Sequence, residues 1–187
     1  MISLIIQVLL LILLSDFITG HIHWWEDVYG NPNWKFLGLG KYVVLPNLEH
    51  HKYPRKLCEG SFFDRIKISL ITGMFILFII YLIFHKLNWQ TIFVIVYSSL
   101  ANEFHSMSHK TDKENGKIVC MMQKIGLIQS RKMHGYHHTS PYNINYCVMT
   151  NYLNPILNKI KYWEFLEWVI SLFGIKVVRG SSIRKGL

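Results

Sequence analysis

Three stretches of the chain are apolar enough to be membrane-spanning helices. They lie at about residues 2–22, 67–85 and 89–109. An uncharged apolar run of about 17 to 25 residues is typical of a transmembrane helix. A cleavable signal peptide is the alternative for the first stretch, but no basic residues open the chain and the residues around Asp16 make a poor cleavage site. The pattern therefore predicts an all-α, multi-pass membrane protein.

A fourth apolar stretch, at about residues 160–175, has the spacing of an amphipathic helix. Its apolar stripe consists of Tyr162, Trp163, Leu166, Val169, Ile170 and Phe173. Glu164 and Glu167 interrupt the stretch, which favours a helix lying in the cytosolic interface of the membrane over a fourth span. Packing of the stripe against the protein itself is the alternative. The length of 187 residues leaves room for a single domain, over residues 1–187.

The distribution of basic residues indicates the orientation of these helices. The chain has 20 Lys and Arg against 11 Asp and Glu, for a formal net charge of +9. With three spans, all the basic residues except Lys86 lie on one side of the membrane, and such an excess marks the cytosolic side. We therefore expect the C-terminus in the cytosol. The same topology explains the basic charge without a nucleic acid partner, for which the chain carries no binding motif.

The composition excludes several classes of protein. Hydrophobic residues make up 51% of the chain and charged residues 17%, whereas soluble domains have about 25% charged residues. An ordinary soluble domain is therefore excluded. The three cysteines are an odd number with no Cys-x-x-Cys pair, which excludes a disulfide framework and a cysteine zinc site. Ten histidines in so apolar a chain require an explanation of their own.

Nine of the ten histidines fall in clusters that the three-span topology brings to one membrane depth. The exception, His85, is expected at the opposite interface, and His21 is expected to neighbour the site without being a ligand. At about 1.5 Å per residue, the first and third spans are each about 30 Å long where they reach His23 and His109, which is the thickness of a hydrocarbon core. Within the third span, His105 and His109 are four residues apart and share one helix face. We expect the metal ligands to be His23, His50, His51, His105, His109, His134, His137 and His138.

Two carboxylates accompany these histidines. Asp27 follows His23 by four residues and Asp16 precedes it by seven, so both share its helix face. We expect both aspartates to act in catalysis, either as metal ligands or by orienting a ligating imidazole. Eight imidazoles exceed the needs of one tetrahedral zinc ion and suit two metal ions. A membrane protein that binds or transports metal without catalysis is the alternative for the whole set.

The type of ligand indicates the chemistry. The His-Glu-x-x-His motif of helical zinc hydrolases is absent from the sequence. Imidazoles combined with a carboxylate suit iron and dioxygen chemistry instead. Because the site lies at the membrane face of an apolar protein, a lipid chain is the expected substrate.

Four sequence blocks, in this order, resemble those of one enzyme family. They are Asp16-Phe17-Ile18-Thr19-Gly20-His21-Ile22-His23-Trp24, Glu49-His50-His51-x-x-Pro54, Asn102-x-x-His105-x3-His109 and His134-x-x-His137-His138-x-Ser140-Pro141. The chain resembles, over almost its whole length, the Kua-type lipid desaturases, which include plasmanylethanolamine desaturase, the bacterial CarF proteins and a plant plastid fatty acid desaturase. It departs from this pattern at Tyr142, where relatives commonly carry a histidine, and at Met107, which replaces a tryptophan.

The resemblance implies an oxygen-dependent desaturase of a membrane phospholipid. In such an enzyme the eight histidines hold two iron ions, dioxygen is the co-substrate, and an external donor such as cytochrome b5 supplies the electrons. The expected location is the endoplasmic reticulum membrane, with the histidine clusters and the C-terminus cytosolic. A metal site at the membrane face reaches only chain carbons near the headgroup, so we expect the double bond there, as in the vinyl ether of plasmalogens. A fatty acyl desaturase or a hydroxylase with the same iron centre is the alternative.

Overall fold

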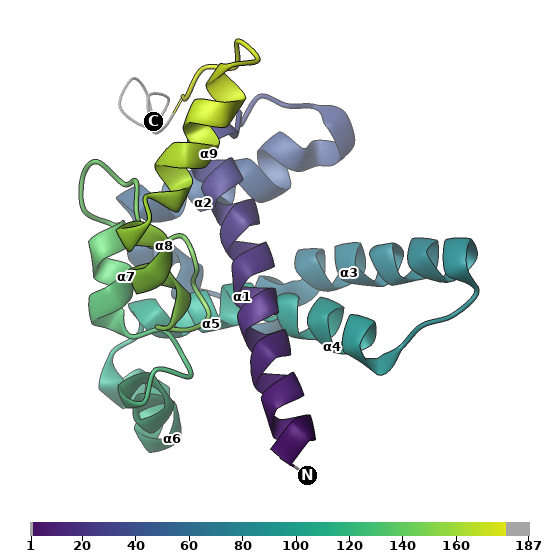
Figure 1. Cartoon of the computed structure of the whole chain (residues 1–187). Coiled ribbons are helices and arrows are strands. Elements are labelled where there is room, and N and C mark those ends of the chain that lie inside the picture. Colours follow the sequence, from purple (N-terminus) through teal and green to yellow (C-terminus); the bar gives the residue numbers. More distant parts are fainter. Residues whose placement is uncertain (1, 179–187) are drawn as a thin grey trace.

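The computed structural model describes residues 2–178, which form helices joined by turns and irregular segments, with no strand among them. The α-helices are α1 (Ile2–Tyr29), α2 (Leu45–Lys52), α3 (Phe62–Phe84), α4 (Trp89–Ser98), α5 (Ala101–His109), α6 (Asp112–Lys124), α7 (Arg131–His137), α8 (Leu153–Lys159) and α9 (Tyr162–Ser171). Three short helical turns, η1 (Phe36–Gly38), η2 (Gly40–Val44) and η3 (Pro54–Cys58), lie between α1 and α3. Figure 1 shows the α3–α4 hairpin on one side of α1 and α5–α8 on the other. The all-α prediction is confirmed.

Two helices, α1 and α3, are long and apolar enough to cross a membrane. Most of the apolar side chains in the first half of α1 and along α3 are exposed on the surface of the protein. The first helix continues beyond its predicted end at residue 22, because its last turns bury Trp24 and Val28 in the core of the protein. The second begins earlier than predicted, since Ser61 and Asp64 form a capping box at its N-terminus.

The third predicted span, residues 89–109, consists of two helices. A turn at Ser99 and Leu100 separates α4 from α5. Helix α4 has ten residues and is therefore about 15 Å long, half the thickness of a hydrocarbon core. Gly73 lets α4 approach α3 closely, because a Cβ there would lie 2.9 Å from Cγ2 of Ile95. The multi-pass topology with a third crossing stays a prediction.

The C-terminal helices pack on the second half of α1. Trp163 of α9 is fully buried, with its ring centroid 5.9 Å from that of Trp24 and 5.0 Å from that of Tyr146. The partly buried side chains beside it include Tyr162, Leu166 and Ile170. This part of the predicted stripe packs against the protein, as the second interpretation proposed, whereas Phe173 is 79% exposed. The helix is also shorter than the predicted 160–175, and its place in a membrane interface stays a prediction.

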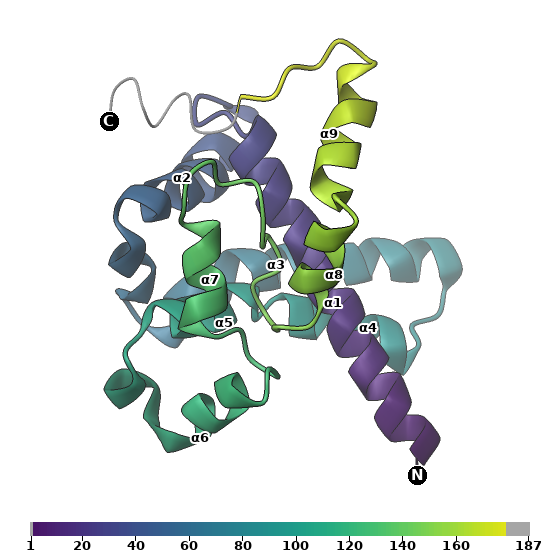
Figure 2. The same ribbon diagram turned by 60° about the vertical axis from the view of Figure 1, so that its left-hand side comes forward.

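An irregular segment between α7 and α8, residues 144–150, runs across α1, and we call it the strap (Figure 2). It touches α1 at Gly20, where an added Cβ would lie 2.7 Å from Sγ of Cys147. Side chains bond its buried backbone: Asn154 accepts from the amide of Cys147 at 3.1 Å, and the Cys147 carbonyl accepts from Asn154 at 2.7 Å and from Gln129 at 2.6 Å. These bonds replace those of a helix or sheet, without which a buried irregular segment would be unstable.

Candidate metal centre

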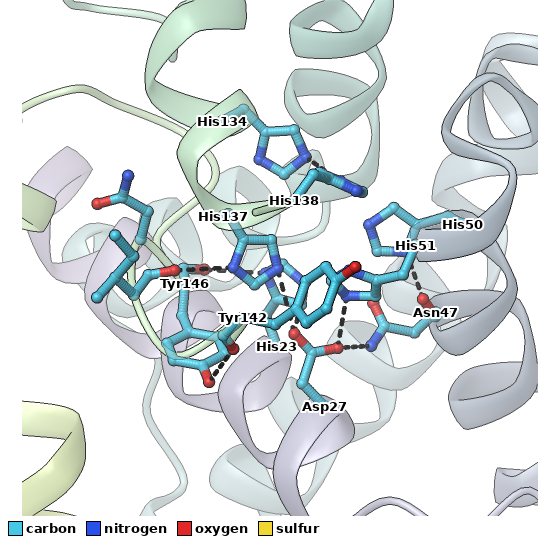
Figure 3. A network of polar contacts seen from close by, with 12 residues as sticks. His23, Asp27, Asn47, His50, His51, His134, His137, His138, Tyr142 and Tyr146 are labelled. Carbon is cyan, nitrogen blue, oxygen red and sulfur yellow. Dashed lines mark hydrogen bonds and ion pairs between the residues drawn. The ribbon is translucent and has the colours of Figure 1, made fainter. Parts of the chain in front are cut away.

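All eight predicted histidines converge in the interior, together with Asp27, and they form two adjoining groups. Figure 3 shows Asp27 beside His23, His50, His51, His134, His137 and His138. The first, which we call the five-histidine group, comprises His50, His105, His109, His134 and His138. The second, the aspartate group, comprises His23, Asp27, His51 and His137. Within each group, one candidate ligand atom per residue lies within 4.8 Å of the others. Helices α1, α2, α5 and α7 supply these side chains, except that of His138, which directly follows α7, so four separate parts of the chain meet here.

The five-histidine group is centred on one nitrogen atom. Nε2 of His134 lies 2.9 Å from Nε2 of His105, 2.9 Å from Nε2 of His109 and 3.0 Å from Nε2 of His138. A neutral imidazole nitrogen either donates one hydrogen bond or accepts, so it cannot satisfy three facing nitrogens with hydrogen bonds alone. A cation that accepts a lone pair from each nitrogen would satisfy them together. The donor set therefore fits a metal ion.

The protonation of this group also suits a metal. Burial, followed by the neighbouring imidazoles, holds the pKa of His50 and of His134 well below its ordinary value. Burial, followed by His137 and His51, lowers the pKa of His138 to about 2. These imidazoles are therefore neutral at neutral pH, which is the form that binds a metal ion.

The aspartate group surrounds one carboxylate. Oδ2 of Asp27 lies 3.2 Å from Nε2 of His137 and 3.5 Å from Nε2 of His23, and its Oδ1 lies 3.0 Å from Nε2 of His51. Asn47 Nδ2 donates to the same Oδ1 at 2.6 Å. Both Nε2 of His23 and Nε2 of His137 are buried without a hydrogen-bond partner, as is Oδ2 of Asp27. Three buried ligand atoms that face one another at 3.2 and 3.5 Å, with no hydrogen-bond partner elsewhere, again fit a metal ion.

Backbone carbonyls orient three of the imidazoles. The strap accepts from Nδ1 of His137 at the Ile144 carbonyl, 2.8 Å away, and from Nδ1 of His23 at the Tyr146 carbonyl, 3.0 Å away. In α2, Nδ1 of His50 bonds the carbonyl of Asn47. A proton held on Nδ1 leaves the lone pair on Nε2, so each of these imidazoles turns its ligating nitrogen to the centre.

A buried ion pair fastens α5, which carries two of the ligands, to α3. Glu103 accepts from Nε of Arg65 at 2.5 Å, and both side chains are about nine-tenths buried. Lys110 lies 3.4 Å from the other carboxylate oxygen of Glu103. Because His105 and His109 follow Glu103 by two and six residues in the same helix, this attachment fixes their position relative to α3.

The other residues singled out in the sequence lie outside the two groups. Asp16 is fully buried, and its carboxylate accepts from the backbone of Met149 and Thr150 rather than from an imidazole. His21 bonds the hydroxyl of Tyr162 at 2.9 Å, and His85 ends α3 at the hairpin turn. Tyr142, a departure from the family pattern, packs edge-to-face against the ring of His51, with the centroids 5.6 Å apart and the planes at 85°.

Two features of the site were missed in the sequence. Asn47 precedes His50 and His51 by three and four residues, a helical spacing that could have marked it as a partner of the site. The carbonyls of Ile144 and Tyr146 have no such signal, because any residue supplies a carbonyl and only the path of the strap brings these two to the histidines.

Comparison with known proteins places the chain among lipid desaturases. Residues 12–178 match the lipid desaturase domain. A protein of Acanthamoeba polyphaga mimivirus named as a probable fatty acid desaturase is 35% identical over 178 residues, which cover 91% of this chain and 84% of that protein. Fatty acid desaturase 4-like 1, chloroplastic, of Arabidopsis thaliana is 30% identical and plasmanylethanolamine desaturase 1 of Mus musculus 27% identical. These matches cover 87% and 84% of this chain, but only 55% and 61% of the two relatives. No solved structure matches the chain.

Proposed function

Because the chain belongs to the lipid desaturase family, we propose that it is an oxygen-dependent desaturase whose two groups of ligands each hold one iron ion. The observation that carries the proposal is the arrangement of eight imidazoles and one carboxylate in two adjoining groups, within an apolar protein. When bound, a pair of irons supplies the oxygen chemistry that removes two hydrogens from adjacent methylenes of a lipid chain. Asp27 and the eight histidines are the metal ligands in this proposal.

The residues around the ligands prepare the site in two ways. They orient the imidazoles, since carbonyls of the strap and of α2 hold the Nδ1 protons of His23, His137 and His50. They also exclude water, because most of the ligand side chains are buried. A dry, oriented set of neutral ligands protects a reactive centre from side reactions.

The substrate we propose is a membrane phospholipid. The exposed apolar surfaces of α1 and α3 favour a location in the bilayer. If residues 2–22 of α1 cross the membrane, His23 lies near the cytosolic end of the span, and the site reaches chain carbons close to the headgroup. A vinyl ether or a bond near the carboxyl carbon is therefore proposed, in line with relatives named plasmanylethanolamine desaturase and fatty acid desaturase.

Two further elements complete the proposal. The electrons come from an external protein such as cytochrome b5, since the sequence carries no haem, flavin or nicotinamide motif. The membrane in this proposal is that of the endoplasmic reticulum. The C-terminus of the chain lies in the cytosol, because a three-span topology leaves the basic residues on that side.

Lipid analysis in cells that lack plasmanylethanolamine desaturase tests the function. Expression of the wild-type chain should restore plasmalogens or give a new double bond near the carboxyl carbon, and only in the presence of oxygen. The His105→Ala and His138→Ala variants, expressed at the same level, should give no product. A hydroxylated lipid would identify a hydroxylase. The absence of any new lipid would refute catalysis, and a single zinc ion in the purified protein would refute the iron centre.

A further inference from the structure

Asp16 is a fully buried carboxylate in the apolar part of α1, outside both groups of ligands. A carboxylate in such surroundings is costly unless hydrogen bonds compensate its lost hydration. It accepts three: from the amide of Met149 at 2.9 Å, from the amide of Thr150 at 3.0 Å and from the hydroxyl of Thr150 at 2.6 Å. All three come from the strap.

The strap is also what orients the aspartate group. Its carbonyls at Ile144 and Tyr146 bond Nδ1 of His137 and Nδ1 of His23, which are two of the three imidazoles of that group. In the five-histidine group, the Nδ1 proton of His50 is held by the carbonyl of Asn47 within α2. A shift of the strap would therefore turn His23 and His137 of the aspartate group. It would leave His50 of the five-histidine group in place.

We propose that Asp16 is a positioning residue for the metal ion of the aspartate group, acting through the strap. The inference rests on the proposed function, because it requires two metal ions. Met149 and Thr150 are held by Asp16, and the carbonyl of Tyr146 lies three residues before Met149 in the same short segment. Between Tyr146 and Met149, Gln129 and Asn154 form hydrogen bonds with the backbone of Cys147. The strap therefore stays attached at Cys147 when its bonds to Asp16 are removed.

Titration of purified, metal-free full-length protein with Co(II) tests this proposal, because it reports on the ligands and requires no turnover. Asp16→Asn keeps the size of the side chain but turns an amide NH₂ toward donors of the strap. It should lower the affinity for one of the two Co(II) ions about tenfold or more and leave the affinity for the other unchanged. A tenfold loss is typical when a group that orients a ligating histidine is removed. The visible spectrum of the Co(II) ion that binds more weakly should also change.

Ser15→Ala is the matched control. Ser15 is the neighbouring buried polar residue of α1, and its hydroxyl bonds the carbonyls of Leu11 and Val94 rather than the strap. Both Co(II) affinities should therefore stay at the wild-type value. If Asp16→Asn fails to fold, Thr150→Val provides the test. It removes the hydroxyl bond to Asp16 and the 3.3 Å bond that the same hydroxyl accepts from the amide of Tyr152, keeps the amide bond of Thr150 to Asp16, and should weaken the binding of the same single ion by a smaller factor.

Two results would overturn the inference. One is unchanged affinity for both ions in Asp16→Asn, or in Thr150→Val if it is the variant that folds. The other is an equal loss of affinity for both ions, which a merely structural role would produce. A wild-type protein that binds two ions with the expected difference between variants, but forms no new lipid, would refute the proposed function and leave the positioning role of Asp16 standing.

Discussion

Replacement of Arg65 by methionine should destabilise the protein strongly, although the residue touches neither group of ligands. Methionine keeps much of the length of the side chain and removes its charge. The change breaks the 2.5 Å bond to Glu103 and the bonds from Nη1 to the carbonyls of Gly60, at 3.0 Å, and Glu59, at 3.3 Å. It leaves the buried carboxylate of Glu103 with Lys110 as its remaining cation, 3.4 Å away.

The size of the effect follows from the burial of the pair. The side chains of Arg65 and Glu103 are 10% and 11% exposed. Removing one partner of a buried ion pair costs about 3–5 kcal/mol, and the contact with Lys110 places this case at the low end, about 3 kcal/mol. In a protein of this size, 1 kcal/mol corresponds to about 2–4 °C in Tm. The expected decrease in Tm is therefore about 6–12 °C.

Thermal unfolding of the metal-free protein in detergent, followed by circular dichroism, measures this decrease. Arg55→Met is the control, because Arg55 pairs with Glu114 at the exposed surface and its loss should leave Tm unchanged. The double variant Arg65→Met with Glu103→Gln removes both charges and should recover part of the loss. A single variant within 2 °C of the wild-type Tm, or a double variant less stable than the single one, would refute this reasoning.

Three further substitutions probe the strap, the aspartate group and the core. Gly20→Ala puts a Cβ 2.7 Å from Sγ of Cys147, and the overpacking should lower the free energy of unfolding by about 1–3 kcal/mol, measured by thermal unfolding. The control Gly135→Ala, whose Cβ meets no atom within 4 Å, should not destabilise the protein. Asp27→Asn removes the carboxylate among the nine proposed ligands and should reduce the iron content from about two ions per chain to one, by elemental analysis. Two ions retained would contradict the assignment. Trp163→Ala empties a fully buried site and should cost about 3–5 kcal/mol, while Trp168→Ala, at a residue 58% exposed, should change Tm little.

The histidines could be predicted from the sequence because their spacing within helices is local. His105 and His109 share a face wherever a helix forms, and the apolar runs before His23 and His109 place both at a similar depth. The division into five and three imidazoles could not be predicted. It depends on how α2 and α7 are rotated about their axes, so that neighbours such as His50 and His51 enter different groups. Tertiary packing sets that rotation.

The two aspartates of α1 show the same limit. Asp16 and Asp27 share one helix face with His23, and the spacing gave no reason to separate their roles. The structure separates them because the strap covers the N-terminal part of this face and the other histidines approach its C-terminal part. The partners of Asp16, Met149 and Thr150, are more than 130 residues away in the sequence, and no local pattern indicates a contact of that range.

The two groups therefore attract a cation by different interactions. Neutral imidazoles carry no charge, so the five-histidine group attracts a cation through the number and orientation of its nitrogens. The aspartate group has three imidazoles and the charge of Asp27, whose attraction for a cation is strong in a buried site. With so few imidazoles, the misorientation of one removes a larger share of its ligands. The strap orients two of these three, His23 and His137, and so supports the group in which the loss of one orientation matters most.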